Sequence, residues 1–332
     1  MSDTAIGEDA QRRETVGFLA TIPLLDGIPE LELAELAGLL RRRELPVGDV
    51  LWHEGDEAIG MVLIVDGRVS LTLRLPGDRT IEVTSVGAGE ILGEVPLFDG
   101  GQHSATARAL EPTSLLWLGR ADFAALIARR HSTAFALKRR IAEVACGRLR
   151  MRLATLAASL DGVPADEPTA PAPPHIVDLE PAGPPDSGYV ARMATFRAFD
   201  SLALWGFLTA GRFAKCAARR TLVAEGSTPD ACYLTMNGAV EQVIVRGGRR
   251  IRVGLAGPGQ AFAYESLIDG GQAAMTATTR ERTLLLVLPR ASFDRLFHGE
   301  TAGSYVFLDV INRHLMAMLR QVVRPQARLG SG

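Results

Sequence analysis

The amino-acid sequence predicts a mainly β protein with flanking helices, in which two small antiparallel β-rolls follow one another along the chain. Three observations predict this fold: an internal repeat, turn residues at short intervals within each copy, and helical spacing of apolar residues on either side. At 332 residues, of which 47% are hydrophobic, the chain is long enough for two domains, each with its own core.

The internal repeat is the strongest of these observations. Residues 89–123 align with residues 259–293 without a gap, and sixteen of the thirty-five aligned positions are identical. Further upstream the offset changes from 170 to 171 residues. The one-residue slip falls near a predicted hairpin, where loop length varies at little cost. A match of this length predicts two copies of one fold.

Each copy is expected to begin with a helix and to continue as strands. Apolar residues recur at helical spacing in residues 31–40 (LELAELAGLL). From about residue 50 to 118, short runs of Val, Ile and Leu alternate with Asp-Gly, Pro-Gly and Gly-Gly, which are typical of turns between half-buried strands. Residues 61–73 are predicted to form one hairpin, and residues 233–245 its counterpart.

A long helix is expected after each roll. Turn signals become rare beyond Ala121 and Ala291, and helical spacing continues to about Leu160 and Val323. The apolar positions of these helices form a stripe. The stripe predicts a protein partner, a homo-oligomer or packing of the two repeats on each other, and packing within one domain is the alternative.

The chain is predicted to divide at a proline-rich segment. Residues 164–185 hold eight of the eighteen prolines, and each proline removes a backbone donor and fixes φ, so a semi-extended linker is expected. Within it, residues 175–179 (HIVDL) are either a docking motif or a segment that packs locally. The predicted parts are a polar N-terminal tail at 1–16, a first domain at 17–160, a linker at 161–189, a second domain at 190–325 and a C-terminal tail at 326–332.

Composition and missing motifs argue against several classes of function. A net charge of −2 leaves no general basic field for nucleic acid, and no stretch approaches the roughly eighteen apolar residues of a membrane span. We expect no signal peptide, and three scattered cysteines suggest buried free thiols in the cytoplasm. The sequence contains no GxSxG, HExxH or P-loop, and its six histidines lack metal-ligand spacing. We expect neither an enzyme nor a bound cofactor.

A short motif in the first copy carries a family resemblance. Gly93-Glu94 precede an Asp-Gly-Gly-Gln sequence, and Ser104-Ala105 follow it. With the repeated rolls and long helices, this motif resembles the cyclic-nucleotide-binding domain family of catabolite-activator sensors, kinase regulatory subunits and nucleotide-gated channels. The resemblance implies jelly-roll-like β-rolls with a phosphate-binding cassette. In the family, backbone N–H groups meet the cyclic phosphate, a Glu accepts from the ribose 2′-hydroxyl and an Arg pairs with the phosphate.

In the first copy, the resemblance implies a site for cyclic AMP, cyclic GMP or a similar small anion. His103 stands at the position of the family's arginine, and a lost charged partner costs about 2–5 kcal/mol. A protonated imidazole, with an ordinary pKa of about 6.5, would restore part of this. Alternatively, His103 is a packed or solvated loop residue, and Glu94 only favours a helix N-terminus. The candidate ligand-binding residues are Gly93, Glu94, Val95, His103, Ser104 and Ala105.

The second copy departs further from the family pattern. Ala263 and Tyr264 replace Gly-Glu, and Glu265 comes one position late. Ala273 stands in place of the arginine and Ala274 in place of the Ser/Thr. We therefore expect a degenerate site and a structural role for this copy.

The region beyond the second long helix bears on DNA binding. Activators of the family carry a helix-turn-helix unit after this helix. Here the helix is predicted to end about Arg324, eight residues before the end of the chain, so we expect no DNA-reading domain. The expected function is a non-enzymatic sensor whose first domain binds the ligand. The rival hypothesis is a ligand-independent scaffold or interaction module with the same folds.

Overall fold

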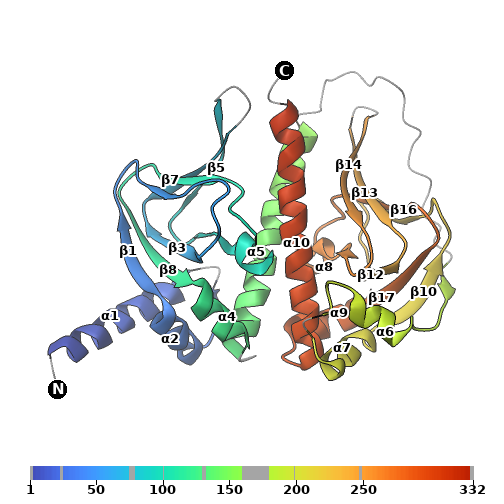
Figure 1. Cartoon of the computed structure of the whole chain (residues 1–332), viewed down its shortest axis with the longest axis horizontal. Coiled ribbons are helices and arrows are strands. Elements are labelled where there is room, and N and C mark those ends of the chain that lie inside the picture. The colour runs from blue at the N-terminus through green and yellow to red at the C-terminus, as the bar shows by residue number, and fades with distance from the viewer. Residues whose placement is uncertain are drawn as a thin grey trace. The chain divides into compact units, whose positions relative to one another are not determined.

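The computed structural model contains two compact units, Met1–Ile141 and Ala142–Gly332, each with one β-roll (Figure 1). The predicted fold class, antiparallel rolls with flanking helices, is confirmed. The structure describes residues 3–22, 25–74, 79–99, 101–128, 132–158, 179–197, 199–246 and 249–329.

Two four-stranded antiparallel sheets form the first roll. The first sheet contains, in spatial order, β1 (Arg41–Leu45), β8 (Thr113–Gly119), β3 (Gly60–Asp66) and β6 (Ile91–Leu92). The second contains β2 (Val50–Trp52), β7 (Thr106–Ala109), β4 (Arg68–Arg74) and β5 (Thr80–Gly87). Aliphatic side chains from both sheets meet Trp52 and Trp117 in a shared core.

The turn at Asp66-Gly67 corrects one prediction. A hairpin is predicted over residues 61–73, but β3 pairs with β8 and β6, whereas β4 pairs with β5 and β7. The turn therefore carries the chain from one sheet to the other. Gly67 has a φ of 91°, and a Cβ there would lie 2.6 Å from a backbone oxygen, so glycine is needed at the crossing. Alternation of apolar residues predicts strands but not their partners.

Among the described residues, the helices α1 (Asp3–Ala20), α2 (Glu30–Leu39), α3 (Glu94–Asp99) and α4 (Arg120–Ala128) accompany this roll, together with the start of the long helix described next. Most of the predicted polar tail at 1–16 is part of α1, which is a difference from the prediction. Arg12 donates two hydrogen bonds to Ala34 O on α2, and Thr15 and Leu19 are buried. The polar composition of the segment concealed a helix that packs on its neighbour.

The long helix α5 (Ser132–Ala158) belongs to both units. It is one continuous helix, and the division between the units falls inside it, after Ile141. The second half of α5, from Ala142 onward, therefore belongs to the unit that contains the second roll. The predicted linker at 161–189 lies later in the chain than this division.

The second roll repeats the first. One antiparallel sheet contains β15 (Ala261–Phe262), β12 (Ala231–Asn237), β17 (Thr283–Pro289), β10 (Arg212–Cys216) and β9 (Glu180–Pro181). The other contains β11 (Thr221–Val223), β16 (Thr276–Thr279), β13 (Val240–Arg246) and β14 (Arg249–Ala256). The hairpin predicted over residues 233–245 is wrong for the same reason as in the first roll, because β12 and β13 lie in different sheets.

The helices of the second unit surround its roll. They are α6 (Ser187–Arg192), α7 (Ser201–Leu208), α8 (Glu265–Asp269), α9 (Arg290–His298) and α10 (Ala302–Leu329). The side chains of Asp186 and Asp200 cap the N-termini of α6 and α7 by accepting from backbone N–H groups. The helix α10 packs on α7 and α9 and passes over β14. It continues through Leu329, into the predicted C-terminal tail at 326–332.

Only the end of the predicted linker lies among the described residues. Residues 159–178, including most of the HIVDL segment at 175–179, lie outside them. Leu179, its last residue, packs on the core of the second roll. The next two residues form β9, where Pro181 is tolerated because the strand lies at the sheet edge. Whether the segment also docks a partner stays a prediction.

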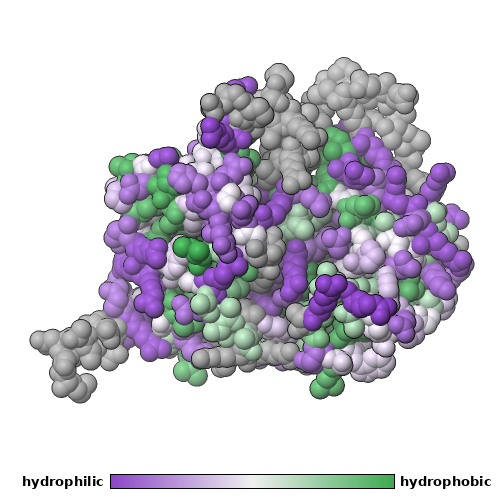
Figure 2. Space-filling model, in the orientation of Figure 1, coloured by the Kyte–Doolittle hydropathy of each residue, from purple (hydrophilic) through white to green (hydrophobic). Residues whose placement is uncertain are grey.

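Surface and thiol properties agree with the composition. Figure 2 shows hydrophilic side chains over much of the visible surface, with apolar patches scattered between them. In the part of the chain that the structure describes, no helix is long and apolar enough to cross a membrane. Cys146, Cys216 and Cys232 are free and buried, as predicted.

Candidate functional site

In the first roll, the loop before α3 has a backbone shape that needs glycine. Gly93 has a φ of 81°, and a Cβ there would lie 3.1 Å from both Gly60 O and the Trp52 ring. The left-handed turn at Gly93 lets Glu94 begin α3 with its side chain only 2% exposed. The sequence therefore places an acidic side chain at the buried start of the short helix.

His103 is packed against the same loop. Its backbone N–H donates to Asp56 O and its carbonyl accepts from Gly55 N–H, both at 2.9 Å. The imidazole is only 5% exposed and stacks on Trp52, with ring centroids 4.0 Å apart and planes 9° from parallel. A Cβ at Gly93 would lie 3.4 Å from His103 Cε1. The imidazole and the Trp52 ring thus both lie next to Gly93, in the loop before α3.

The structure brings together some of the predicted residues and not others. Gly93 and His103 lie next to the Trp52 ring, and Glu94 directly follows Gly93 in the chain. Ser104 has an exposed side chain, and Ala105 is half-buried. The Val95 side chain lies outside the described residues. Sequence reasoning missed Trp52, although its place two residues before the repeated Glu-Gly turn was a usable signal.

The second roll keeps the backbone of this site with different side chains. Ala273 N–H donates to Ser227 O and Ala273 O accepts from Gly226 N–H, both at 2.8 Å, as His103 does with its own loop. Ala263 holds the left-handed conformation, with a φ of 61°, where the first roll has glycine. Ala274 is half-buried, whereas its counterpart in the first roll, Ser104, is exposed. The fold of the cassette is therefore retained without its arginine or its glycine.

Tyr264, at the position of the family's glutamate, connects the cassette to α10. The residue is fully buried, and its hydroxyl lies 2.8 Å from His314 Nδ1 on α10, with the rings edge to face. Burial raises the pKa of Tyr264 well above its ordinary value and lowers the pKa of His314 to about 4. Both groups are therefore neutral near neutral pH, and they share a hydrogen bond in a dry environment.

Glu265 begins α8 and is 4% exposed. Burial raises the pKa of its carboxyl to about 7. Within the described residues, its Oε1 and the neighbouring Ser266 Oγ have no hydrogen-bond partner. A buried carboxyl without full hydrogen bonding favours its protonated form.

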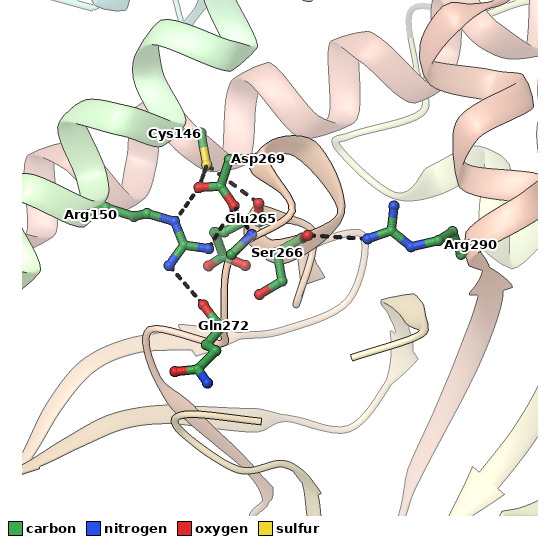
Figure 3. A network of polar contacts seen from close by, with 8 residues as sticks. Cys146, Arg150, Glu265, Ser266, Asp269, Gln272 and Arg290 are labelled. Carbon is green, nitrogen blue, oxygen red and sulfur yellow. Dashed lines mark hydrogen bonds and ion pairs between the residues drawn. The ribbon is translucent and has the colours of Figure 1, made fainter. Parts of the chain in front are cut away.

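The second half of α5 contacts the cassette of this roll (Figure 3). Two nitrogens of the Arg150 guanidinium bind Asp269: Nη2 donates to Oδ1 at 2.8 Å, and Nε donates to Oδ2. Arg150 Nη1 also donates to Gln272 O at 2.7 Å. One turn earlier on α5, Cys146 Sγ lies 3.7 Å from Glu265 O and 3.6 Å from Asp269 Oδ2. The helix is therefore held on α8 and the loop after it.

A family model for the cyclic nucleotide-binding domain matches residues 42–130 and 214–300, one match in each roll. The chain belongs to this family. The predicted tandem arrangement is confirmed, with one cyclic nucleotide-binding domain in each roll. We refer to them as domain 1 and domain 2. Among the described residues, no group of His, Cys, Asp or Glu side chains could hold a metal ion.

Known proteins match one or both domains. A cyclic AMP receptor protein from Thermus thermophilus is 35% identical over 125 residues, which is 36% of this chain and 58% of that protein. A cyclic nucleotide-gated potassium channel from Rhizobium etli is 35% identical over 123 residues, 36% of this chain and 33% of the channel. The chain thus spans less than two thirds of these relatives. The cAMP-bound regulatory domain of Toxoplasma gondii PKA aligns over 88% of this chain and 94% of its own, with 17% identity and a TM-score of 0.34.

Proposed function

We propose that this chain is a non-enzymatic regulatory protein in which domain 1 binds a cyclic nucleotide or a similar small anion and domain 2 is structural. The observation that carries the proposal is the contrast between the two cassettes. Domain 1 has Gly93, a buried Glu94 and an imidazole at the arginine position, whereas Tyr264 in domain 2 is bonded to α10. The free, buried thiols also support a reducing location, the cytoplasm.

The environment of His103 supports an anion site. The Trp52 face lies parallel to the imidazole at 4.0 Å, and an aromatic face stabilises a cation placed over it. A bound phosphate would favour the charged imidazole further. Imidazole offers fewer donors than guanidinium and is ionised only at lower pH, so binding should be weaker than with arginine and should depend on pH. A Thermus relative named as a cyclic AMP receptor supports cyclic AMP as the first ligand to test.

Two features of domain 2 support the structural role. Tyr264 replaces the residue that would accept from a ribose, and its hydroxyl is already bonded to His314. Ala273 supplies no charge for a phosphate. A cyclic nucleotide would have to break the Tyr264–His314 bond without gaining a charged partner, and that exchange is unfavourable.

Calorimetric titration of cyclic AMP and cyclic GMP into the full chain tests the proposal. We expect saturable binding with one site per chain, roughly tenfold tighter at about pH 6 than at about pH 8 because protonated His103 is the form that binds. His103→Ala should abolish binding. His103→Arg should strengthen binding at about pH 8 by at least about tenfold and remove its pH dependence, because guanidinium stays charged.

A matched substitution in domain 2 provides the control. Ala273→Arg restores the family residue there but leaves Tyr264 in place, so it should add no second binding site. Absence of binding by either nucleotide at millimolar concentration, in wild type and in His103→Arg alike, would reject the sensor proposal. That result would favour a ligand-independent interaction module.

We also propose that α5 and α10 form the surface through which the protein binds a partner protein or a second copy of itself. Their apolar stripe is buried within the single chain, for example at Leu149, Leu153, Leu315 and Leu319. A contact would therefore use the outer faces of these helices, where Met151 is exposed. Light scattering over a range of concentrations should give a mass above the 35.6 kDa of one chain if the partner is a second copy.

A further inference from the structure

Two carboxyl groups lie near one guanidinium at the cassette of domain 2, and only one of them is bonded to it. Glu265 and Asp269 lie four residues apart on α8, and so on the same side of this short helix. Arg150 on α5 directs all three of its nitrogens at Asp269 and Gln272 O (Figure 3). The arginine is thus fully engaged with the second carboxyl and the loop after it, while Glu265 Oε1 has no hydrogen-bond partner among the described residues.

The groups around Glu265 supply little further positive charge. Cys146 on α5, Cys232 on β12 and Tyr264 all have a raised pKa because they are buried, so they are neutral. His314 on α10 is bonded to Tyr264 and is neutral as well, since burial lowers its pKa to about 4.

Two arginines and one carboxylate complete the charged surroundings. Arg290 on α9 donates to Ser266 O at 3.3 Å, on the side of α8 away from Arg150 in Figure 3. Asp269 adds a negative charge close to Glu265. Arg150, already bound to Asp269, is the cation that acts on Glu265. Ionised Glu265 would therefore be a second buried anion without a cation of its own.

We propose that Glu265 is a proton-responsive switch that controls the docking of the second half of α5 on the cassette of domain 2. With Glu265 protonated, the α8 carboxyls carry one negative charge, and Arg150 balances it. With Glu265 ionised, the docked arrangement buries a second negative charge beside the first. Undocking exposes α8 to water and relieves this cost.

The sign of the response follows from linkage. The pKa of Glu265 in the docked structure is about 7, above its ordinary 4.5, because burial outweighs both the hydrogen bond from its own backbone N–H and the attraction of Arg150. The docked state therefore binds the proton more tightly than the undocked state does. Docking is strongest below about pH 4.5, weakens as the pH rises through 7, and levels off above that value.

Hydrogen exchange of the full chain without nucleotide measures this docking directly. We expect the protection of α5 amides in residues 146–157, after correction for intrinsic exchange rates, to fall about tenfold between about pH 6 and about pH 8. Glu265→Gln mimics the protonated carboxyl and should keep the higher protection at both pH values. Because no ligand is added, failure here would leave the proposed nucleotide binding of domain 1 untouched.

Two further variants make the experiment decisive. Glu241→Gln removes another buried carboxyl of the same roll, but one already paired with Arg250 and Arg280, so the pH step in α5 should persist. Asp269→Asn frees Arg150 for Glu265, which should move the step to lower pH even if Glu265→Gln folds poorly. The proposal is overturned if α5 protection is flat across this range in wild type, or if Glu265→Gln retains the step.

Discussion

Tyr264 and His314 are a buried polar pair that carries no charge. Burial keeps the phenol protonated and the imidazole neutral, and each satisfies the other at 2.8 Å. Such a pair avoids the large desolvation cost of an ion pair and still fixes the direction of two side chains. It therefore holds α10 over the cassette of domain 2 by an interaction that salt does not screen.

Removing the phenol hydroxyl should weaken domain 2. Tyr264→Phe leaves His314 Nδ1 buried without its partner, so we expect the free energy of unfolding to fall by about 1–2 kcal/mol. Urea denaturation followed by tryptophan fluorescence measures this. Tyr233→Phe is the control, because Tyr233 is also buried in this roll and packs through its ring, which stacks on Phe262 and is kept by the substitution; its effect should stay below about 0.5 kcal/mol.

The lowered pKa of His314 predicts a loss of stability in acid. Its pKa is about 4 in the folded protein and 6.5 in the unfolded chain, so unfolding takes up a proton between these values. The contribution of neutral His314 to the free energy of unfolding is complete above pH 6.5 and is lost as the pH falls towards 4. His314→Gln cannot titrate, so its melting temperature should fall less than that of wild type between these pH values. Equal falls would contradict the prediction.

At the scale of elements, the loops that enter α3 and α8 differ in strain. Gly93 takes its left-handed φ without cost, whereas Ala263 takes the same conformation with a Cβ. A left-handed alanine costs about 1–2 kcal/mol, and the extra freedom of glycine in the unfolded chain returns about 0.5–1 kcal/mol. The second loop thus retains a backbone shape that its sequence no longer favours.

A reciprocal pair of substitutions tests this strain. Ala263→Gly should stabilise the protein by about 0.5 kcal/mol. Gly93→Ala should destabilise it by about 1–3 kcal/mol, because its Cβ would also lie 3.1 Å from Gly60 O and Trp52. Both values come from denaturant titration. A loss of stability in Ala263→Gly would mean that the left-handed turn is not strained.

The elements themselves could be predicted from the sequence, but their partners could not. Apolar alternation identified the strands around Asp66-Gly67, and the turn residues identified the break between them. The assignment of those strands to different sheets depends on contacts of β3 with β8 and of β4 with β7, which join residues roughly 50 and roughly 40 positions apart in the chain. Local patterns carry no information at that distance. The helix α1 was missed because its buried positions are few among charged ones.

For the whole molecule, the contacts divide the chain inside α5, after Ile141, whereas the sequence predicts a boundary at the proline-rich segment. Fragment stability provides a test. A fragment of residues 142–329 retains Arg150 and the buried Leu149, Leu153 and Leu156, whereas a fragment of residues 179–329 loses them. We expect the longer fragment to be more stable by at least about 3 kcal/mol in urea. Equal stabilities would place the boundary at the linker instead.

The candidate site was partly accessible from the sequence. The repeat gave the positions of Glu94 and His103, because two copies of one motif can be compared with each other. The packing of His103 on Trp52 and the bond from Tyr264 to His314 were not predicted, since each joins residues about fifty positions apart. The hydrogen bonds from Arg150 to Asp269 and Gln272 were also not predicted, because Arg150 lies on a helix that the sequence assigned to the first domain.

The crossing of the chain between sheets at Gly67 and Gly238 has a consequence for folding kinetics. Most strand pairings in each roll join distant segments, such as Arg41 with Trp117 and Arg212 with Val287, so closure should be slow. While the rolls are still closing, each strand can also pair with the equivalent strand position of the neighbouring repeat, because the two repeats share many identical residues. We therefore expect refolding to yield a fraction of chains with exchanged strands, and early folding of one repeat during synthesis to suppress it.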